Sequence, residues 1–375
     1  MRHPGGPVVN DSYGLPSPYE RSVVRRTPKH YPFPGVAESG TPLQDLHGII
    51  TPNGLHYVRD HAGVPDIDPA SHRLLVHGLV ERPLIFTVDD LLRLPAVSRT
   101  HFLECSGNSW YFWEPDKLKP GFTAQHTHGL LSCAEWTGAR VADVFAAAGV
   151  RPEAKWVLAE GADSAAMARS SPVAKMLDDA ILAYAQNGER LRPEQGYPLR
   201  LFLPGYEGNT NVKWLRRLKL GAVPFETRDE TAGYTELLPD GRALQFFLVM
   251  EAKSVITRPS GGQQLAAPGF HDVSGIAWSG YGRIRRVDVS TDGGTTWREA
   301  TLQAPVMSKC LTRFRLPWTW DGQPALLMSR AEDETGYVQP TRAALVAARG
   351  TKGHYHYNGI VGWRIDAEGA VSVAV

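Results

Sequence analysis

The stretch that decides the fold is His101-Phe-Leu-Glu-Cys-Ser-Gly-Asn-Ser109. It begins as a short apolar segment with strand character and ends in a Ser-Gly-Asn turn, so a strand would hold Cys105 while the backbone bends away from it. Such a turn presents a thiolate, which is the form of cysteine that binds metals and attacks electrophiles. Because most free cysteines are simply buried, Cys105 alone does not decide between packing and chemistry.

The composition around this stretch is that of a globular protein. The chain has 375 residues, enough for two domains, and 42% of them are hydrophobic. The formal net charge is +1, which gives no reason to expect a nucleic acid or a membrane surface as partner. The 37 glycines and 28 prolines favour many turns and short strands.

Three cysteines, Cys105, Cys133 and Cys310, are too few and too widely spaced for a disulfide framework or a zinc ribbon. Two of them could still pair. No apolar run approaches the length of a membrane span. The first residues lack the apolar segment of a signal peptide, so either the protein stays in the cytoplasm or its leader is missing from this sequence.

The chain divides into three segments by composition and pattern. Residues 1–45 are rich in Pro, Gly, Ser and Arg, and we expect an extended arm. Residues 46–248 alternate irregularly between strand-like and helix-like stretches, which predicts an α+β catalytic domain. Residues 249–375 contain short strands separated by turn signals, which predict an antiparallel sandwich of immunoglobulin type.

Individual elements follow from periodicity and capping residues. Thr87 and Asp90 would cap a short helix over 87–94, and Gly149 would end a second helix over 140–148. The Asp-Gly and Gly-Gly turn signals predict a hairpin at 284–297. Other predicted strands cover residues 73–80, 156–159, 199–203, 310–316 and 325–329.

Three further local stretches carry chemical groups. In Tyr57-Val-Arg-Asp-His61, the planar fork of Arg59 suits an oxyanion, although a lone arginine is more often a surface ion-pair partner. The second stretch is Gln195-Gly-Tyr-Pro-Leu-Arg200. The third, the basic stretch 207–219, could hold a phosphate through charge-assisted bonds, or it could be a solvated basic face.

The paired histidines are a weaker signal. His126 with His128, and His354 with His356, would each share one face of a strand. A metal site would need a third ligand nearby in the sequence, so we interpret both pairs as ordinary polar histidines.

Together these stretches resemble the sulfite oxidase family of molybdenum enzymes, over nearly the whole chain past the arm. Within that family the sequence is most similar to the catalytic subunits of sulfane dehydrogenases, with shared stretches at 48–54, 191–198 and 333–340. The motifs with family counterparts are Tyr-Val-Arg-Asp-His (57–61), Glu-Cys-Ser-Gly-Asn (104–108), Glu-Trp-Thr-Gly (135–138), Gly-Tyr-Pro-Leu-Arg (196–200), Asn-Val-Lys-Trp-Leu (211–215) and Ala-Trp-Ser-Gly-x-Gly (277–282).

The resemblance implies a molybdopterin-binding domain, an immunoglobulin-like dimerisation domain, a homodimer and a molybdenum-molybdopterin cofactor. Cys105 would be the protein thiolate on molybdenum, a sensible soft ligand. Arg200 and Lys213 would pair with the cofactor phosphate. The implied catalytic residues are Cys105, Arg59, Tyr234 and Arg349. The implied cofactor-binding residues are Tyr57, Val58, Arg59, His61, Cys105, Asp163, Ser170, Gln195, Arg200, Asn211 and Lys213.

Two departures from the family pattern bear on the substrate. Ser109 and Trp110 stand where most sulfite oxidases carry arginines, and Glu230 follows Asp229 where the family has its active-site tyrosine, so Tyr234 is the nearest replacement. We therefore expect a small sulfur oxyanion or a protein-bound sulfane sulfur as substrate. An ordinary sulfite oxidase acting on free sulfite is one alternative, and a cofactor-free binding module on the same scaffold is another.

The sequence contains neither a b-type haem domain nor a C-x-x-C-H haem site. Electrons would then leave to a separate acceptor such as a c-type cytochrome. The resemblance points to the periplasm, with the cytoplasm as the alternative because the sequence has no recognisable leader.

Overall fold

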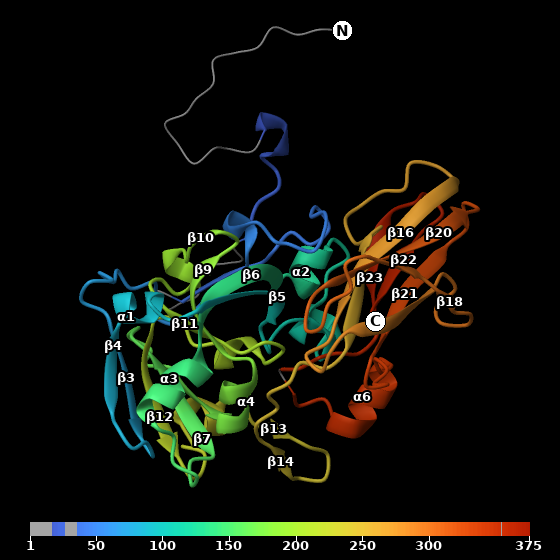
Figure 1. Cartoon of the computed structure of the whole chain (residues 1–375). Helices are drawn as coiled ribbons and strands as arrows, with labels where there is room; N and C mark the ends of the chain where they lie inside the picture. The colour runs from blue at the N-terminus through green and yellow to red at the C-terminus, as the bar shows by residue number, and fades with distance from the viewer. Residues whose placement is uncertain (1–16, 27–35, 354) are drawn as a thin grey trace, which may run out of the picture.

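The computed structural model describes residues 17–26, 36–353 and 355–375, which form an α+β body followed by a β-sandwich (Figure 1). The predicted fold class is confirmed: a mixed α+β domain is followed by an antiparallel sandwich. Within the described residues, no helix is both long and apolar enough to cross a membrane.

Two sheets form the α+β body. The first has the order β10 (Glu189–Arg190), β9 (Ile181–Gln186), β6 (Leu131–Arg140), β5 (Ala96–Glu104), and β11 (Arg200–Phe202) also pairs with β9. The second has the order β4 (Leu84–Thr87), β3 (Arg73–Gly78), β12 (Leu215–Gly221), β7 (Trp156–Gly161), β8 (Ala168–Pro172). Strands β12 and β3 are parallel, and the other pairs in these two sheets are antiparallel.

Short helices cover these sheets as their capping residues predict. Helix α1 (Val88–Leu92) begins with the capping box of Thr87 and Asp90. Helix α3 (Val141–Ala148) ends at Gly149, whose φ of +70° is the left-handed conformation that glycine adopts easily. Helix α3, helix α4 (Val173–Asp178) and strands of both sheets share one apolar core.

The sandwich buries alternate residues of its strands. One sheet has the order β15 (Lys253–Arg258), β16 (Gly269–Trp278), β20 (Thr312–Trp320), β19 (Thr301–Gln303). The other has the order β18 (Arg298–Glu299), β17 (Ile284–Ser290), β21 (Ala325–Asp333), β22 (Gly362–Ile365), β23 (Val371–Ala374). Strand β20 alternates buried and more exposed positions, and Trp278, Phe314 and Trp363 lie in the shared core.

Several short elements lie outside these sheets. Strand β1 (Ala37–Ser39) pairs with β2 (Val58–Asp60), so the end of the predicted arm adds a strand to the body; residues 1–16 and 27–35 of that arm lie outside the described residues. Helix α5 (Arg228–Ala232) and the hairpin of β13 (Glu236–Leu237) and β14 (Ala243–Leu244) connect the body to the sandwich, and α6 (Arg342–Arg349) follows β21.

The strand predicted for His126 and His128 is wrong, because both residues belong to helix α2 (Ala124–His128). The imidazole of His126 lies at N3 and bonds the Thr123 backbone and hydroxyl, which starts the helix. His354 lies outside the described residues.

The two bodies are in direct contact beside β5 and β6. Cys133 of β6 and Cys310, which precedes β20, are free thiols whose sulfur atoms lie 3.5 Å apart. The Phe102 N–H of β5 donates to the carbonyl of Lys309. The sandwich is therefore packed against the strand that leads to Cys105.

Candidate active site

Cys105 follows β5 and lies in the wall of a cavity of about 440 Å³. The cavity lies between the turn after β5, strands β1 and β2, and the loops before and after β11. Eleven of the sequence-predicted residues line it: Tyr57, Val58, Arg59, His61, Cys105, Asp163, Gln195, Arg200, Asn211, Lys213 and Tyr234.

The turn after β5 holds Cys105 at the cavity. The Cys105 N–H donates to the carbonyl of Leu130 at 3.0 Å, and the Asn108 N–H donates to the carbonyl of Cys105 at 2.9 Å. Burial raises the pKa of the Cys105 thiol to about 11, so the sulfur is protonated at neutral pH unless a metal displaces the proton.

The buried carboxylate of Glu104 fixes this turn to the sandwich. It accepts hydrogen bonds from Lys253 of β15 at 2.9 Å, from the indole of Trp278 at 2.6 Å and from the Asn108 amide at 2.9 Å. Burial lowers the pKa of Lys253, and Glu104 opposes that shift. Removing one partner of such a pair typically costs about 3–5 kcal/mol, because a buried charge is left uncompensated.

A buried guanidinium without a carboxylate partner marks one end of the cavity. Arg200 of β11 donates from Nη1 to the carbonyl of Gln195 at 3.0 Å and from Nη2 to the carbonyl of Asn211 at 3.1 Å. In the described part of the chain its Nε has no partner and no carboxylate forms an ion pair with it. Burial lowers its pKa to about 10, so Arg200 remains a cation and needs an anion.

Lys213 lies at the same end of the cavity but is already paired. Its ammonium bonds the carboxylate of Asp60 and donates to the carbonyls of Arg59 at 3.2 Å and Glu194 at 3.0 Å. Burial lowers the pKa of Lys213, while the charge of Asp60 opposes this shift. The uncompensated positive charge is therefore at Arg200 rather than at Lys213.

His61, Asp163 and Gln195 complete this end. Burial, helped by Arg59 and Lys213, lowers the pKa of His61 to about 4, so its imidazole is neutral at pH 7. Burial raises the pKa of Asp163. The Gln195 amide donates to the carbonyl of Tyr57 at 3.0 Å and fixes the backbone of the Tyr57 segment.

Three tyrosines surround the other end of the cavity. Burial raises the pKa of Tyr57, Tyr234 and Tyr355, and the nearby Cys105 adds to the rise in each case. The rings of Tyr234 and Tyr355 are 5.0 Å apart. A Cβ at Gly208 would lie 2.9 Å from the Tyr57 hydroxyl and 3.1 Å from the Cys105 Cα, so glycine is required there.

Comparison with known proteins identifies the family of each of the two domains. Residues 61–228 match the model of the oxidoreductase molybdopterin binding domain, and residues 245–361 match that of the Mo-co oxidoreductase dimerisation domain. The crystal structure of the sulfane dehydrogenase SoxCD from Paracoccus pantotrophus is similar over 100% of this chain and 96% of that chain, with 45% identity and a TM-score of 0.95. The chain belongs to the sulfite oxidase family of molybdopterin oxidoreductases.

Curated members of the sulfite oxidase family are more distant. Mitochondrial sulfite oxidase of Mus musculus is 33% identical over 79% of this chain and 58% of its own length. Sulfite oxidase of Gallus gallus is 35% identical over 79% of this chain and 69% of its own length. The chain thus spans little more than half of the mouse relative.

The residues around Cys105 fit the molybdopterin cofactor of this family. Within the described residues, no group of three or more His, Cys, Asp or Glu side chains is placed to hold a metal ion. A metal on Cys105 would therefore take its other ligands from outside the protein, as a pterin dithiolene provides. The buried Arg200, whose Nε has no hydrogen-bond partner and which forms no ion pair among the described residues, suits the phosphate of such a cofactor.

Two predicted site residues lie outside the cavity lining. The Ser170 hydroxyl donates to the carboxylate of Glu230 at 3.1 Å and accepts from the Phe225 N–H at 3.0 Å. Arg349 forms an ion pair with Glu251 at 2.6 Å and donates to the carbonyl of His356 at 3.2 Å. Both side chains are thus engaged by other residues and do not line the cavity.

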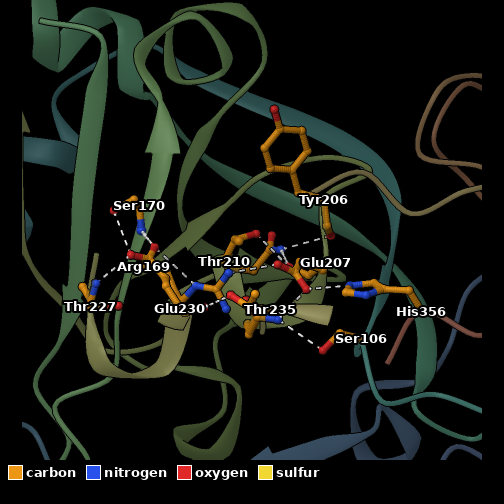
Figure 2. A network of polar contacts seen from close by, with 12 residues as sticks. Ser106, Arg169, Ser170, Tyr206, Glu207, Thr210, Thr227, Glu230, Thr235 and His356 are labelled. Carbon is orange, nitrogen blue, oxygen red and sulfur yellow. Dashed lines mark hydrogen bonds and ion pairs between the residues drawn. The ribbon is translucent and has the colours of Figure 1, made fainter. Parts of the chain in front are cut away.

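Other residues near the site were missed by the sequence analysis. Tyr355 lines the cavity and lies in the sequence between His354 and His356, which are predicted above to be ordinary polar histidines. Glu207 begins the basic stretch, whose predicted role rests on its cations alone; the Glu207 carboxylate contacts both His356 and Arg169 (Figure 2). In the sequence, the only sign of this role is a single acid at the start of a basic stretch.

Proposed function

We propose that this chain oxidises sulfur at the sulfite or sulfane level by two-electron oxygen transfer, with molybdenum-molybdopterin bound in the cavity at Cys105. The observation that carries the proposal is the pairing of one wall thiol with the unpaired, buried Arg200 in a single cavity. In the overall reaction the sulfur gains an oxygen atom from water, and two protons and two electrons are released.

Each part of the cavity would have a separate task. Molybdenum-molybdopterin, when bound, supplies the two-electron redox couple and the oxygen transfer itself. Cys105 would be its protein ligand, and Arg200 with Lys213 would bind its phosphate. Arg59 would orient the substrate oxyanion, while the Tyr234 phenol would donate a hydrogen bond at the reacting end.

The charge balance of the cavity favours a substrate of low charge. Among the described residues, the lining carries five carboxylates and four cations, and Lys213 is paired with Asp60 and Lys117 with Glu114. Such a lining presents little net positive charge to a free sulfite dianion. The cationic lining residues are Arg59, Lys117, Arg200 and Lys213, and the acidic ones are Glu38, Asp60, Glu114, Asp163 and Glu194.

A sulfane sulfur carried on a protein cysteine is therefore the preferred substrate, and free sulfite is the alternative. The SoxCD structure is that of a sulfane dehydrogenase, which supports this preference. Electrons would pass to an external acceptor such as a c-type cytochrome. The dimerisation domain supports a homodimer. We propose the periplasm as the compartment, by resemblance, with the cytoplasm as the alternative.

The test is to purify the chain from a host that makes the cofactor and to assay sulfite and a cysteine-persulfide peptide with cytochrome c as acceptor. We expect close to one molybdenum per chain and a higher kcat/KM for the persulfide. A higher kcat/KM for sulfite would favour an ordinary sulfite oxidase. Absence of molybdenum would favour a cofactor-free binding module.

A further inference from the structure

Five ionisable side chains form an unbroken row of alternating charge beneath the cavity, and we call this row the charge chain. His356 contacts Glu236 at 2.9 Å and Glu207 at 2.9 Å. Arg169 contacts Glu207 at 3.0 Å and Glu230 at 3.6 Å. All five residues are buried, with at most 5% of any of them exposed. Figure 2 shows Arg169 and His356 approaching Glu207 from opposite sides.

The charge chain joins parts of the protein that are far apart in sequence. Arg169 lies on β8 and Glu207 lies just before the 3-10 helix Gly208–Thr210, both in the α+β body. His356 follows α6 in the C-terminal part of the chain. Its backbone N–H donates to the carbonyl of Ser106 at 2.7 Å, directly after Cys105. The charge chain is thus attached to the turn that carries the candidate metal ligand.

The two ends of the charge chain bracket Tyr234 in the sequence. Glu230 lies on α5, four residues before Tyr234, and Glu236 begins β13, two residues after it. Glu230 is held by Arg169 and by the hydroxyl of Ser170, and Glu236 is held by His356. A segment of seven residues, 230–236, is therefore fixed at both ends by buried carboxylates.

The middle of the charge chain also contacts the Tyr234 ring directly. The Arg169 guanidinium carbon lies 4.3 Å from the centroid of that ring. Among the described residues, Arg169 Nη1 and Nε have no hydrogen-bond partner, so the stacked ring is a major neighbour of the guanidinium. Tyr355, which packs 5.0 Å from Tyr234, is the residue before His356.

We propose that the charge chain is a positioning device, in which Arg169, His356 and Glu207 act through Tyr234 by holding its phenol at the reacting end of the cavity. The inference rests on the proposed function, because it takes Tyr234 as a group that acts on the substrate. Burial opposes protonation of His356, but its hydrogen bonds to Glu207 and Glu236 raise its pKa to about 9, so the row keeps alternating charges at pH 7.

The decisive experiment combines substitutions in the charge chain with Tyr234→Phe. Arg169→Lys keeps the charge without the planar stacking face, and Glu236→Gln keeps a hydrogen-bonding group but removes the charge. With molybdenum content per chain unchanged, each variant should lower kcat by about tenfold or more, since small displacements at a reacting centre are costly. In the Tyr234→Phe background each should cost less than about twofold, because residues acting through one group are not additive.

Amide hydrogen exchange gives a readout independent of turnover. Exchange in residues 231–236 should become faster in Arg169→Lys and Glu236→Gln, because the segment opens more readily when one anchor is weakened. The matched control is Lys175→Met, which removes another buried cation that pairs with Asp179 and donates to the Pro204 carbonyl. Its exchange in 231–236 and its kcat should match those of the wild type.

The outcomes separate the two proposals. If Tyr234→Phe leaves kcat unchanged in enzyme that contains molybdenum, Tyr234 has no catalytic role. Amide exchange in residues 231–236 then still tests whether the charge chain holds the segment: faster exchange in the charge-chain variants shows that it does, and unchanged exchange shows that it does not. If Tyr234→Phe lowers kcat but the charge-chain substitutions reduce kcat equally in both backgrounds, the positioning role is overturned. Unchanged exchange in both charge-chain variants would also overturn it.

Discussion

The cationic end of the cavity and its tyrosine end are built from different kinds of structure. Arg200 begins β11, which pairs with β9, and Lys213 lies just before β12, where its ammonium is held by the Asp60 carboxylate and by two backbone carbonyls. Tyr234 lies between a short helix and a two-residue strand, and Tyr355 lies in a loop after α6. The cations expected to bind the cofactor thus lie on or beside strands of the α+β body, whereas the tyrosines of the reacting end lie in connecting segments that are held by contacts with distant residues.

Cys105→Ser should have the largest effect, because this residue is the proposed protein ligand of the metal. A hydroxyl is a poor ligand for a soft site, so we expect no measurable turnover and an altered molybdenum spectrum. Cys133→Ser and Cys310→Ser are the matched controls, since both cysteines are buried away from the cavity and should leave turnover near the wild-type value. Full activity in purified Cys105→Ser protein would refute the assignment of the cavity.

Substitutions at the cationic end should lower cofactor content rather than the rate per bound molybdenum. Arg200→Ala removes a buried cation that has no acid partner, and Lys213→Ala removes one that is paired with Asp60. We therefore expect Arg200→Ala to contain less molybdenum per chain than Lys213→Ala. The loss of one charge-assisted bond should lower the affinity for the cofactor by about tenfold. The control is Arg216→Ala, at an exposed position on β12. Equal occupancy in all three variants would contradict the phosphate assignment.

At the substrate side of the cavity, Trp110→Arg should improve sulfite binding. Trp110 lines the cavity, with the Tyr111 ring stacked 4.1 Å away and the Lys117 ammonium 5.1 Å from its ring. An added guanidinium offers a fork of donors to a dianion, so the KM for sulfite should fall several-fold while kcat changes little. Steady-state assays with sulfite on the wild type and on Trp110→Arg would measure both constants. If the wild type already binds sulfite tightly and Trp110→Arg gives no gain, free sulfite is the better substrate.

The smallest expected effect is on the free energy of unfolding and its pH dependence, through the buried His356. Its pKa is raised from 6.5 to about 9 in the folded protein, so its stabilising contribution is complete below pH 6.5 and is lost as the pH rises through about 9. The contribution is on the order of 3 kcal/mol, since each pKa unit corresponds to about 1.4 kcal/mol. Denaturant titrations should show the wild type losing more stability between pH 6 and pH 10 than His356→Gln does.

Other groups titrate in the same range, which is why the comparison with His356→Gln is needed. Burial lowers the pKa of Lys175 to about 8 and that of Arg200 to about 10, and both groups are present in the two proteins. Their contributions cancel in the difference between wild type and variant. Parallel stability curves for the two proteins would show that His356 is not held as a buried cation.

The sequence by itself determined those features that depend on neighbouring residues. The capping box of Thr87 and Asp90, the helix end at Gly149 and the hairpin signals after residue 284 each act within a few residues, and the structure contains the corresponding elements. The motif residues Arg59 and Arg200 also have local support, because Arg59 lies within β2 and Arg200 begins β11.

The tertiary structure decided everything that requires two distant segments to meet. Lys253 reaches Glu104 across 149 residues of sequence and fixes the Cys105 turn. His356 reaches Glu207 across 149 residues as well, and Tyr355 enters the cavity beside it. The pairing of a buried carboxylate with a cation depends on where both lie in the folded core, since the low dielectric there makes an unpaired charge costly. No local pattern shows that pairing, so the sequence predicted the thiolate, the cations, Tyr57 and Tyr234, while the structure placed Tyr355 and the buried acids around them.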